Sequence, residues 1–372
     1  TRIMTQHFDS TTMPQFFGQR FQSPSLKIGA SIIIFIFLIP YTASLFNGLS
    51  RLFGMAFNID YTVCIILMGV LTGIYVIAGG YMATAINDFV QGCIMLVGIC
   101  AVVGAILNTQ GGFSEALHNL AAVSDSTTTN GDVPGIYASF FGPEPVNLLG
   151  VVLLTSLGTW GLPQMVQKFY AIKSEDAIHK GTVISTIFAL VVSGGCYFMG
   201  GFGRLFSDQV DVATEGYDAI VPTMLSNLPE LLIAIVVILV LSASMSTLSA
   251  LVMTSSSTIT LDLLKGNMVK KMNDFQAVFI IRCFIVVFII ISMVIAIIQY
   301  KYSISFIAQL MGVSWGALAG AFLAPFLYSL YWKKATKAAC WASFLFGAGV
   351  MSLNLLSNAT GLFAFPALLQ SS

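Results

Sequence analysis

The chain has 372 residues, of which 57% are hydrophobic and 9% are charged, against about 25% charged residues in an ordinary soluble domain. This composition excludes a water-soluble globule, and at roughly 20 residues per span the chain has room for about nine or ten membrane helices. The 16 Lys and Arg residues equal the 16 Asp and Glu residues, so the net charge indicates neither a nucleic acid nor an acidic partner.

Long apolar runs recur along the chain, separated by polar segments. Nine runs are long enough to cross a bilayer, and they predict an all-α polytopic membrane protein with one transmembrane domain over 1–372. The predicted spans lie near 28–50, 59–83, 89–107, 147–170, 181–203, 229–260, 277–300, 303–332 and 335–357. An apolar stub follows at 361–369, and the 229–260 run is long enough to tilt or to extend beyond the bilayer as a helix.

Lysine and arginine concentrate in every second loop. One set of loops holds only Arg51, Arg204 and Lys301. The other set holds Arg2, Arg20, Lys27, Lys168, Lys173, Lys180, Lys265, Lys270, Lys271, Lys333, Lys334 and Lys337. Because cytoplasmic loops carry the excess of positive charge, the pattern predicts a multi-pass protein of the plasma membrane whose first residue is cytoplasmic and whose last residue is outside.

Chemistry-bearing side chains are sparse inside the predicted spans. The acidic residues and histidines lie in loops or at span edges, which disfavours a proton relay. No nucleophile, base and orienting residue can be assembled into an enzyme site, and we expect no organic cofactor. The six cysteines stand singly in apolar stretches, which predicts small buried side chains rather than disulfides or a zinc site. The external segments 108–146 and 204–226 are predicted to be connecting loops with short surface helices.

A hydroxyl-rich stretch in the sixth span, LSASMSTLSALVMTSSSTIT at 241–260, is the most informative segment. Ala243, Ser246 and Thr247 are spaced i, i+3 and i+4, so two hydroxyls and one carbonyl can converge on a small cation. Neutral oxygens suit Na⁺, whose single charge can be desolvated by dipoles alone. We refer to these three residues as the sodium trio. The alternative is that such hydroxyls bond to the carbonyl four residues earlier or allow close helix packing.

The fourth span is interrupted by the sequence GTWGLP at 158–163. Proline lacks an amide donor and glycine loosens a helix, so the segment predicts unpaired backbone groups that face a cavity or another helix. The alternative is a packing kink. Trp160 lies too deep for an interfacial position, and Gln164 and Gln167 are polar groups that need partners inside the membrane.

Three motifs in order along the chain carry a specific resemblance. They are GGYMATAINDFVQG at 79–92, GTWGLPQMVQKFYAIKS at 158–174 and LSASMSTLSALVMTSSSTITLDLLK at 241–265. With the predicted topology, they resemble the solute:sodium symporter family. The resemblance implies a core of two five-helix inverted repeats with helices broken at mid-membrane.

The resemblance also assigns the spans to core helices. It makes 28–50 the third core helix, 303–332 the tenth and 335–357 an extra helix, so the first two are expected to be absent from an N-terminally truncated chain. It implies that Na⁺ is the coupling ion, held by the sodium trio and by backbone oxygens of the first core helix. We therefore expect that the 372-residue chain by itself does not transport.

The resemblance implies two further groups of site residues. Asp88 with Ser249 is the implied second cation or coupling site. The alternative role of Asp88 is a helix cap, because Gln91 follows three residues later as in a capping box. The implied substrate-binding residues are Tyr41, Thr159, Trp160, Gln164, Gln167 and Gln309.

The predicted function is sodium-coupled import of a small organic solute by alternating access. The alternatives are a symporter-like sensor domain of a larger signalling protein and a passive channel. Thr159 stands where the sodium/proline carriers have a second aromatic residue, and GLPQ at 161–164 stands where they and the pantothenate carriers have GQPH. These departures argue against proline and pantothenate, and the sequence identifies neither the solute nor the oligomeric state.

Overall fold

The computed structural model consists of helices, and the part of the chain that it describes contains no β-strand. The described residues are 4, 7–8, 10–124, 130, 132–170, 172, 174–210, 216–226, 228–265, 269, 272–302 and 307–360. The apolar stub at 361–369 lies outside them. The fold class expected from the sequence, an all-α membrane protein, is confirmed.

The described part of the chain forms a series of helices. In chain order they are α2 (Met13–Arg20), α3 (Pro24–Phe57), α4 (Tyr61–Thr109), α5 (Phe113–Ala122), η1 (Ile136–Ala138), α6 (Pro145–Ser156), η2 (Gly158–Gly161), α7 (Pro163–Tyr170), α8 (Glu175–Phe188), η3 (Ala189–Ser193), α9 (Gly194–Gly201), η4 (Phe202–Gln209), η5 (Tyr217–Ala219), α11 (Ile220–Ser226), α12 (Glu230–Ser257), η6 (Thr258–Leu264), α13 (Asp274–Tyr302), α14 (Ile307–Tyr331) and α15 (Lys337–Thr360). The segments η3 and η6 are π-helical, and the other η segments are 3₁₀ helices.

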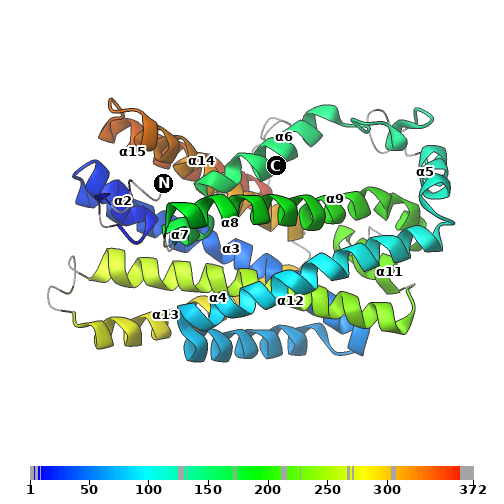
Figure 1. Cartoon of the computed structure of the whole chain (residues 1–372), viewed down its shortest axis with the longest axis horizontal. Coiled ribbons are helices and arrows are strands. Elements are labelled where there is room, and N and C mark those ends of the chain that lie inside the picture. Colours follow the sequence, from blue (N-terminus) through cyan, green and yellow to red (C-terminus); the bar gives the residue numbers. More distant parts are fainter. Residues whose placement is uncertain are drawn as a thin grey trace.

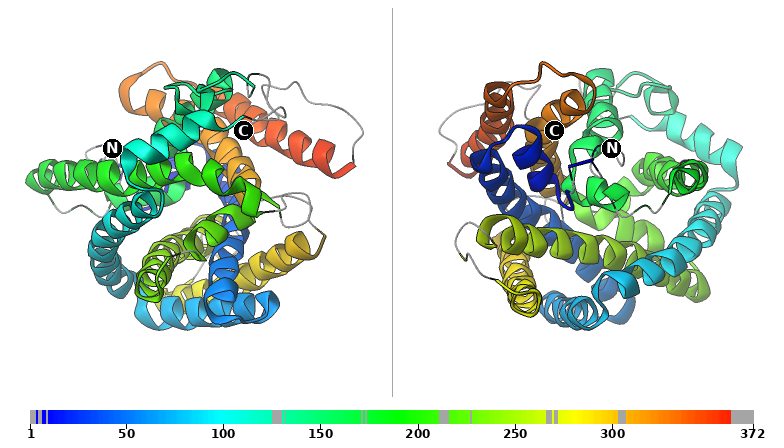
Figure 2. Two further views of the ribbon diagram at one scale, coloured as in Figure 1. Left: turned by 90° about the vertical axis from the view of Figure 1, so that its right-hand side faces the viewer. Right: turned by 60° about the vertical axis from the view of Figure 1, so that its left-hand side comes forward.

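Eight helical segments within the described residues are long and apolar enough to cross a membrane. Each coincides with one of the nine predicted spans. The remaining predicted span, 147–170, consists of α6, η2 and α7, of which α6 alone is a short apolar helix. The long helices lie along one axis, with α2 at one end and α5 at the other (Figure 1), and the turned views show the same bundle from its sides (Figure 2).

The helix α4 is two helices that meet at a sharp break, visible as the diverging halves in Figure 1. Gly80 has φ +60° and ψ −170° there, a conformation that glycine adopts without a Cβ clash. The predicted spans 59–83 and 89–107 correspond to the two halves of α4, and the second half is helical from residue 82. Asp88 lies inside this half, so the alternative interpretation of Asp88 as a helix cap is wrong.

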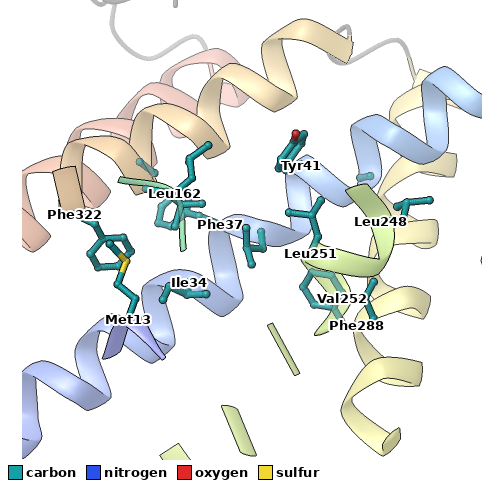
Figure 3. Packing of buried hydrophobic residues seen from close by; sticks show 14 of the residues in the cluster. Met13, Ile34, Phe37, Tyr41, Leu162, Leu248, Leu251, Val252, Phe288 and Phe322 are labelled. Carbon is teal, nitrogen blue, oxygen red and sulfur yellow. The ribbon is translucent and has the colours of Figure 1, made fainter. Parts of the chain in front are cut away.

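The main hydrophobic core lies where α3 packs against α12, α13 and α14 (Figure 3). Leu251 and Val252 of α12 and Phe288 of α13 are fully buried there. A second part of the core is aromatic, with Phe17 of α2 stacked on Phe322 of α14 at a centroid distance of 5.9 Å. These contacts hold α2 and the long helices together by burial of apolar surface.

Polar contacts fix α2 at two other helix ends. Asp262 of η6 is fully buried, and its carboxylate accepts hydrogen bonds from Thr12 Oγ1 at 2.6 Å and Gln15 Nε2 at 2.7 Å. Arg20 donates to the carbonyls of Ser329 and Trp332 at 3.1 and 3.3 Å, near the end of α14. Because the last carbonyls of a helix have no partners within that helix, the guanidinium is well placed to satisfy them.

The cysteines differ from expectation. All six are free thiols, but only Cys64 and Cys340 are buried. The other four, Cys93, Cys100, Cys196 and Cys283, are exposed on the surface of the protein. The prediction of buried side chains is wrong for these four, because an apolar sequence around a cysteine does not distinguish a protein core from a lipid-facing surface.

The helices α14 and α15 approach one another most closely at Gly347. A Cβ atom at this position would overlap the backbone atoms Ala321 N and Gly320 C. The hydroxyl of Ser343, one turn earlier, donates to the carbonyls of Gly320 and Ala321 at 3.1 and 3.0 Å. Small residues thus allow the two backbones to touch, as they do at other membrane helix contacts.

We expect Gly347→Ala to lower the apparent Tm of the detergent-solubilised protein by several degrees. Backbone atoms cannot move aside as a side chain can, and overpacking costs about 1–3 kcal/mol. Gly349→Ala on the same helix is the matched control, because a Cβ there meets nothing within 4 Å. Thermal denaturation followed by size-exclusion chromatography measures both variants, and equal Tm values would contradict this contact.

Candidate functional site

The sodium trio lies on a half-buried face of α12. Thr247 Oγ1 donates to the carbonyl of Ala243 at 3.0 Å, and Ser249 Oγ donates to that of Ser246 at 2.9 Å. The hydrogen bond from Thr247 to Ala243 is a bond to the carbonyl four residues earlier, as the alternative interpretation predicted. It leaves the hydroxyl lone pairs available, so the same geometry is compatible with coordination of a cation by neutral oxygens.

The interruption of the fourth span is a turn of 3₁₀ helix followed by one extended residue. Leu162 has φ −83° and ψ 119°, and its amide donates to Thr159 O at 3.2 Å. The Leu162 carbonyl accepts from both Met165 N and Val166 N at 3.1 Å. The expectation of unpaired backbone groups is wrong for these positions, because short-range hydrogen bonds across the break satisfy them.

A cavity of about 340 Å³ opens between α4, α7 and α12. Its lining residues are Thr84, Ala85, Asp88, Gln164, Gln167, Lys168, Ser249, Ala250, Met253, Thr254 and Ser257. The structure thus brings together four residues that the sequence assigned to two different sites, namely Asp88, Ser249, Gln164 and Gln167. The cavity lies towards the end of the molecule that carries α2, where α7 and the break in α4 are found (Figure 1).

The cavity and the sodium trio share one side of α12. Residues 243, 246, 247, 250, 253, 254 and 257 follow the i, i+3, i+4 pattern of one helix stripe. Ala250 and Thr254 line the cavity, and they lie one to two turns after the trio. At 1.5 Å of rise per residue, Thr254 is about 10 Å along the axis from Thr247.

The polar groups of the cavity differ in how well they are satisfied. Gln167 Oε1 accepts from Thr254 Oγ1 at 2.7 Å, and Lys168 Nζ lies 3.3 Å from Asp88 Oδ2. Gln164 is only 3% exposed, yet neither its Nε2 nor its Oε1 has a hydrogen-bond partner among the described residues. The buried Asp88 Oδ1 has none either. Buried polar atoms are nearly always paired in folded proteins, with protein groups, water or a ligand, so these atoms are the groups of the cavity with capacity for a further partner.

The other predicted substrate residues do not line this cavity. Tyr41 points from α3 towards α14 (Figure 3), where its ring meets that of Trp315 edge to face at 5.7 Å. Thr159 Oγ1 donates to Ser156 O at 2.9 Å, and the Trp160 side chain is 55% exposed. Gln309 is half-buried on α14. The structure therefore separates the six predicted substrate residues into two cavity residues and four that lie elsewhere.

Two residues that form polar contacts in the cavity, Lys168 and Thr254, were not singled out from the sequence. Lys168 was counted only among the loop cations, and Thr254 only as part of the hydroxyl-rich stretch. The sequence could have predicted that Lys168 lies near the two glutamines. Gln164, Gln167 and Lys168 are spaced i, i+3 and i+4 and so share one face of α7. The partner of that face, Asp88, could not be read from local spacing.

The comparisons with known proteins agree with the predicted family and fold. Residues 3–347 match the family model described as "Sodium:solute symporter family". The chain belongs to the sodium:solute symporter family, as its motifs predicted. It is part of a multi-pass plasma-membrane transporter that imports a solute with Na⁺ as the coupling ion, and it is not an enzyme. Nothing favours the sensor or channel alternatives.

The relatives are transporters of similar architecture. The chain is 28% identical over 361 residues to the osmoregulated proline transporter OpuE of Bacillus subtilis, covering 95% of this chain and 70% of that protein. It is 30% identical over 352 residues to the sodium/proline symporter of Staphylococcus aureus, covering 92% of this chain and 65% of the relative. The chain thus spans about two thirds of the length of these relatives.

A solved structure supports the fold alone. It is the substrate-bound outward-open state of a Na⁺-coupled sialic acid symporter, which is 15% identical to this chain. The match has a TM-score of 0.66 and covers 97% of this chain and 79% of that structure. At this identity the common feature is the helix arrangement.

We expect Gln164→Leu to raise the apparent Tm by a few degrees while weakening solute binding. A buried amide without partners costs about 1–3 kcal/mol, and an apolar side chain of similar size removes that cost. Gln167→Leu is the matched control on the same face, and it should lower the Tm because it leaves Thr254 without its acceptor. Thermal denaturation and solute binding are measured on both variants. A Gln164→Leu variant that loses stability and keeps its solute affinity would contradict a ligand-binding role.

Proposed function

We propose that the full-length protein imports a small, polar organic solute together with Na⁺ through the cavity between α4, α7 and α12. The observation that carries the proposal is the convergence of Asp88, Gln164, Gln167 and Ser249 on one cavity beside the sodium trio. Helices broken at Gly80 and at 158–163 open the space between these side chains. Such broken helices are where transporters of this architecture place their sites.

The size and lining of the cavity define the class of solute. A volume of about 340 Å³ lies at the lower end of small-molecule pockets, about 300–1,000 Å³. The two glutamines offer amide donors and acceptors, and Asp88 and Lys168 supply one charge of each sign. This lining fits a small zwitterion of the amino-acid type, a class that includes proline, the solute after which both relatives are named. Proline is one candidate solute. The differences from the sodium/proline carriers at Thr159 and Gln164 argue against it.

Sodium is proposed to bind at the trio through the carbonyl of Ala243 and the hydroxyls of Ser246 and Thr247. Two hydroxyls and one carbonyl are fewer oxygens than a sodium hydration shell supplies, so other parts of the full-length protein complete the coordination. Because the trio and the cavity share one side of α12, an ion on the trio changes the electrostatic field that a solute meets. Binding of Na⁺ and solute then strengthen one another by the same factor.

The orientation follows from the charge pattern. The helix ends near α2 belong to the Lys- and Arg-rich set of loops, and those near α5 to the poor set. By the positive-inside rule, the end that carries α2 and the cavity faces the cytoplasm, and the first residue is cytoplasmic. With nine crossings the last residue is outside. The oligomeric state forms no part of the proposal.

We expect Ser246→Ala and Thr247→Ala each to raise the sodium concentration for half-maximal uptake roughly tenfold. Each variant removes one hydroxyl oxygen that is proposed to coordinate Na⁺. A hydrogen bond to a charged group is worth about 1.5–3 kcal/mol, and we expect a loss of similar size here. Ser256→Ala is the matched control, since its side chain lies about 140° around α12 from Ala243 and outside the cavity lining. Solute uptake by the full-length protein in liposomes, titrated with Na⁺, measures all three variants.

The sodium dependence decides the outcome. If both trio variants keep the wild-type sodium dependence, the assignment of the trio as the sodium site is wrong. If Ser256→Ala shifts the sodium dependence equally, the effect is a general response of α12 and not coordination.

A further inference from the structure

The turn between α14 and α15 carries a cluster of lysines. Lys333 and Lys334 lie in the turn, and Lys337 is the first residue of α15. All three are exposed. No acidic residue follows Asp274 in the sequence, so this part of the chain has no carboxylate to neutralise them. We refer to these three lysines as the basic turn.

Three lysines elsewhere in the same set of loops have carboxylate partners. They are Lys27, which lies 4.0 Å from Asp262, Lys168, which lies 3.3 Å from Asp88, and Lys265, which lies 3.2 Å from Asp274. The side chains of the basic turn, by contrast, form no ion pair and no hydrogen bond with any other residue that the structure describes. Neighbouring like charges repel one another, so the basic turn favours an anionic partner.

Exposed aromatic side chains border the basic turn. The rings of Tyr328 and Trp332 meet edge to face at a centroid distance of 5.5 Å, and these side chains are 56% and 54% exposed. Tyr331 is 81% exposed. Tyrosine and tryptophan concentrate at the level of the lipid headgroups, because each combines an apolar ring with a polar group. Since α14 is long and apolar enough to cross the membrane, these residues at its end put the basic turn at that level.

Hydrogen bonds from two directions fix the backbone of the turn. Arg20 of α2 donates to Ser329 O at 3.1 Å and to Trp332 O at 3.3 Å, and the amide of Ala335 also donates to Trp332 O at 3.3 Å. The lysines therefore project from an ordered backbone. An anion that binds them does not have to order the chain, which lowers the entropic cost of binding. The Arg20 guanidinium adds a fourth positive charge beside the turn.

We propose that the basic turn binds the headgroup of an anionic phospholipid in the cytoplasmic leaflet. Its ammonium groups donate to the phosphate oxygens, and the exposed rings of Tyr328, Tyr331 and Trp332 pack against the glycerol end of the acyl chains. A lipid is favoured over a soluble anion because these rings place the lysines in the headgroup layer. The leaflet follows from the proposed orientation, in which this set of loops is cytoplasmic. The site is separate from the solute cavity and from the sodium trio.

The test is the response of the full-length protein to added lipid. Titrating dioleoyl-phosphatidylglycerol into the protein in a non-ionic detergent should raise its apparent Tm, whereas dioleoyl-phosphatidylcholine and inorganic phosphate should have little effect. The double variant Lys333→Gln/Lys334→Gln should need roughly ten- to thirtyfold more phosphatidylglycerol for half of the stabilisation, since each lysine near an anionic headgroup contributes about fivefold. Lys333→Arg/Lys334→Arg should respond like wild type, because it keeps both charges.

The double variant Lys180→Gln/Lys265→Gln is the matched control. It removes the same charge from the same set of loops, but away from the basic turn. Lys180 is exposed, and the pair of Lys265 with Asp274 is too exposed to contribute much stability. This variant should keep the wild-type response to phosphatidylglycerol. An equal loss of response would show a general effect of net charge and would overturn the site.

Three other results would contradict the inference. An unchanged response of Lys333→Gln/Lys334→Gln would show that the lysines do not bind the headgroup. Equal stabilisation by phosphatidylcholine would show that any lipid suffices, and equal stabilisation by inorganic phosphate would show that the ligand is a free anion. The titration requires no transport, so a full-length protein without sodium-dependent uptake would refute the proposed function and leave the lipid site standing.

Discussion

The site depends on the contact between the broken fourth span and the backbone of α14. Gly161, in the 3₁₀ turn, lies so close to α14 that a Cβ atom would come within 2.9 Å of Leu323 N and 3.0 Å of Ala319 Cα. With glycine at this point the turn rests directly on its neighbour. Helix α7 therefore restarts at Pro163 from a fixed position, and its polar face is directed towards α4 and α12.

The same contact explains how a break in a helix is tolerated within the membrane. Hydrocarbon offers no hydrogen bonds to backbone groups, so a break must satisfy its own. The carbonyl of Leu162 does this by accepting two amides of α7, and the buried Leu162 side chain adds to the hydrophobic core. These hydrogen bonds and the contact with α14 fix the backbone geometry of the break. Such a break holds the Gln164 amide at a buried position without a hydrogen-bond partner among the described residues, where we propose that the solute binds.

Local sequence patterns predicted the helices and the segment in which the fourth span breaks, because apolar runs, glycine and proline act through neighbouring residues. They misplaced the boundary near Asp88, because an apolar run with two adjacent glycines does not show that Gly80 takes a positive φ and residues 82–88 stay helical. The cavity could not be predicted from local spacing, since Lys168 and Asp88 are 80 residues apart. The spacing of the sodium trio left back-bonding as an alternative, and the family resemblance assigned the sodium site. Its role as a sodium site is still a proposal.

Helix α2 contacts both η6, which continues α12, and the end of α14. These contacts affect how the molecule can open at that end. Separating α2 from η6 would remove from the buried Asp262 carboxylate its bonds from Thr12 and Gln15. Lys27 Nζ of α3, 4.0 Å from Asp262 Oδ1, would remain as a charged partner, but the two short hydrogen bonds would have to be replaced by water. We therefore expect separation of α2 at this end to be coupled to hydration of the Asp262 carboxylate.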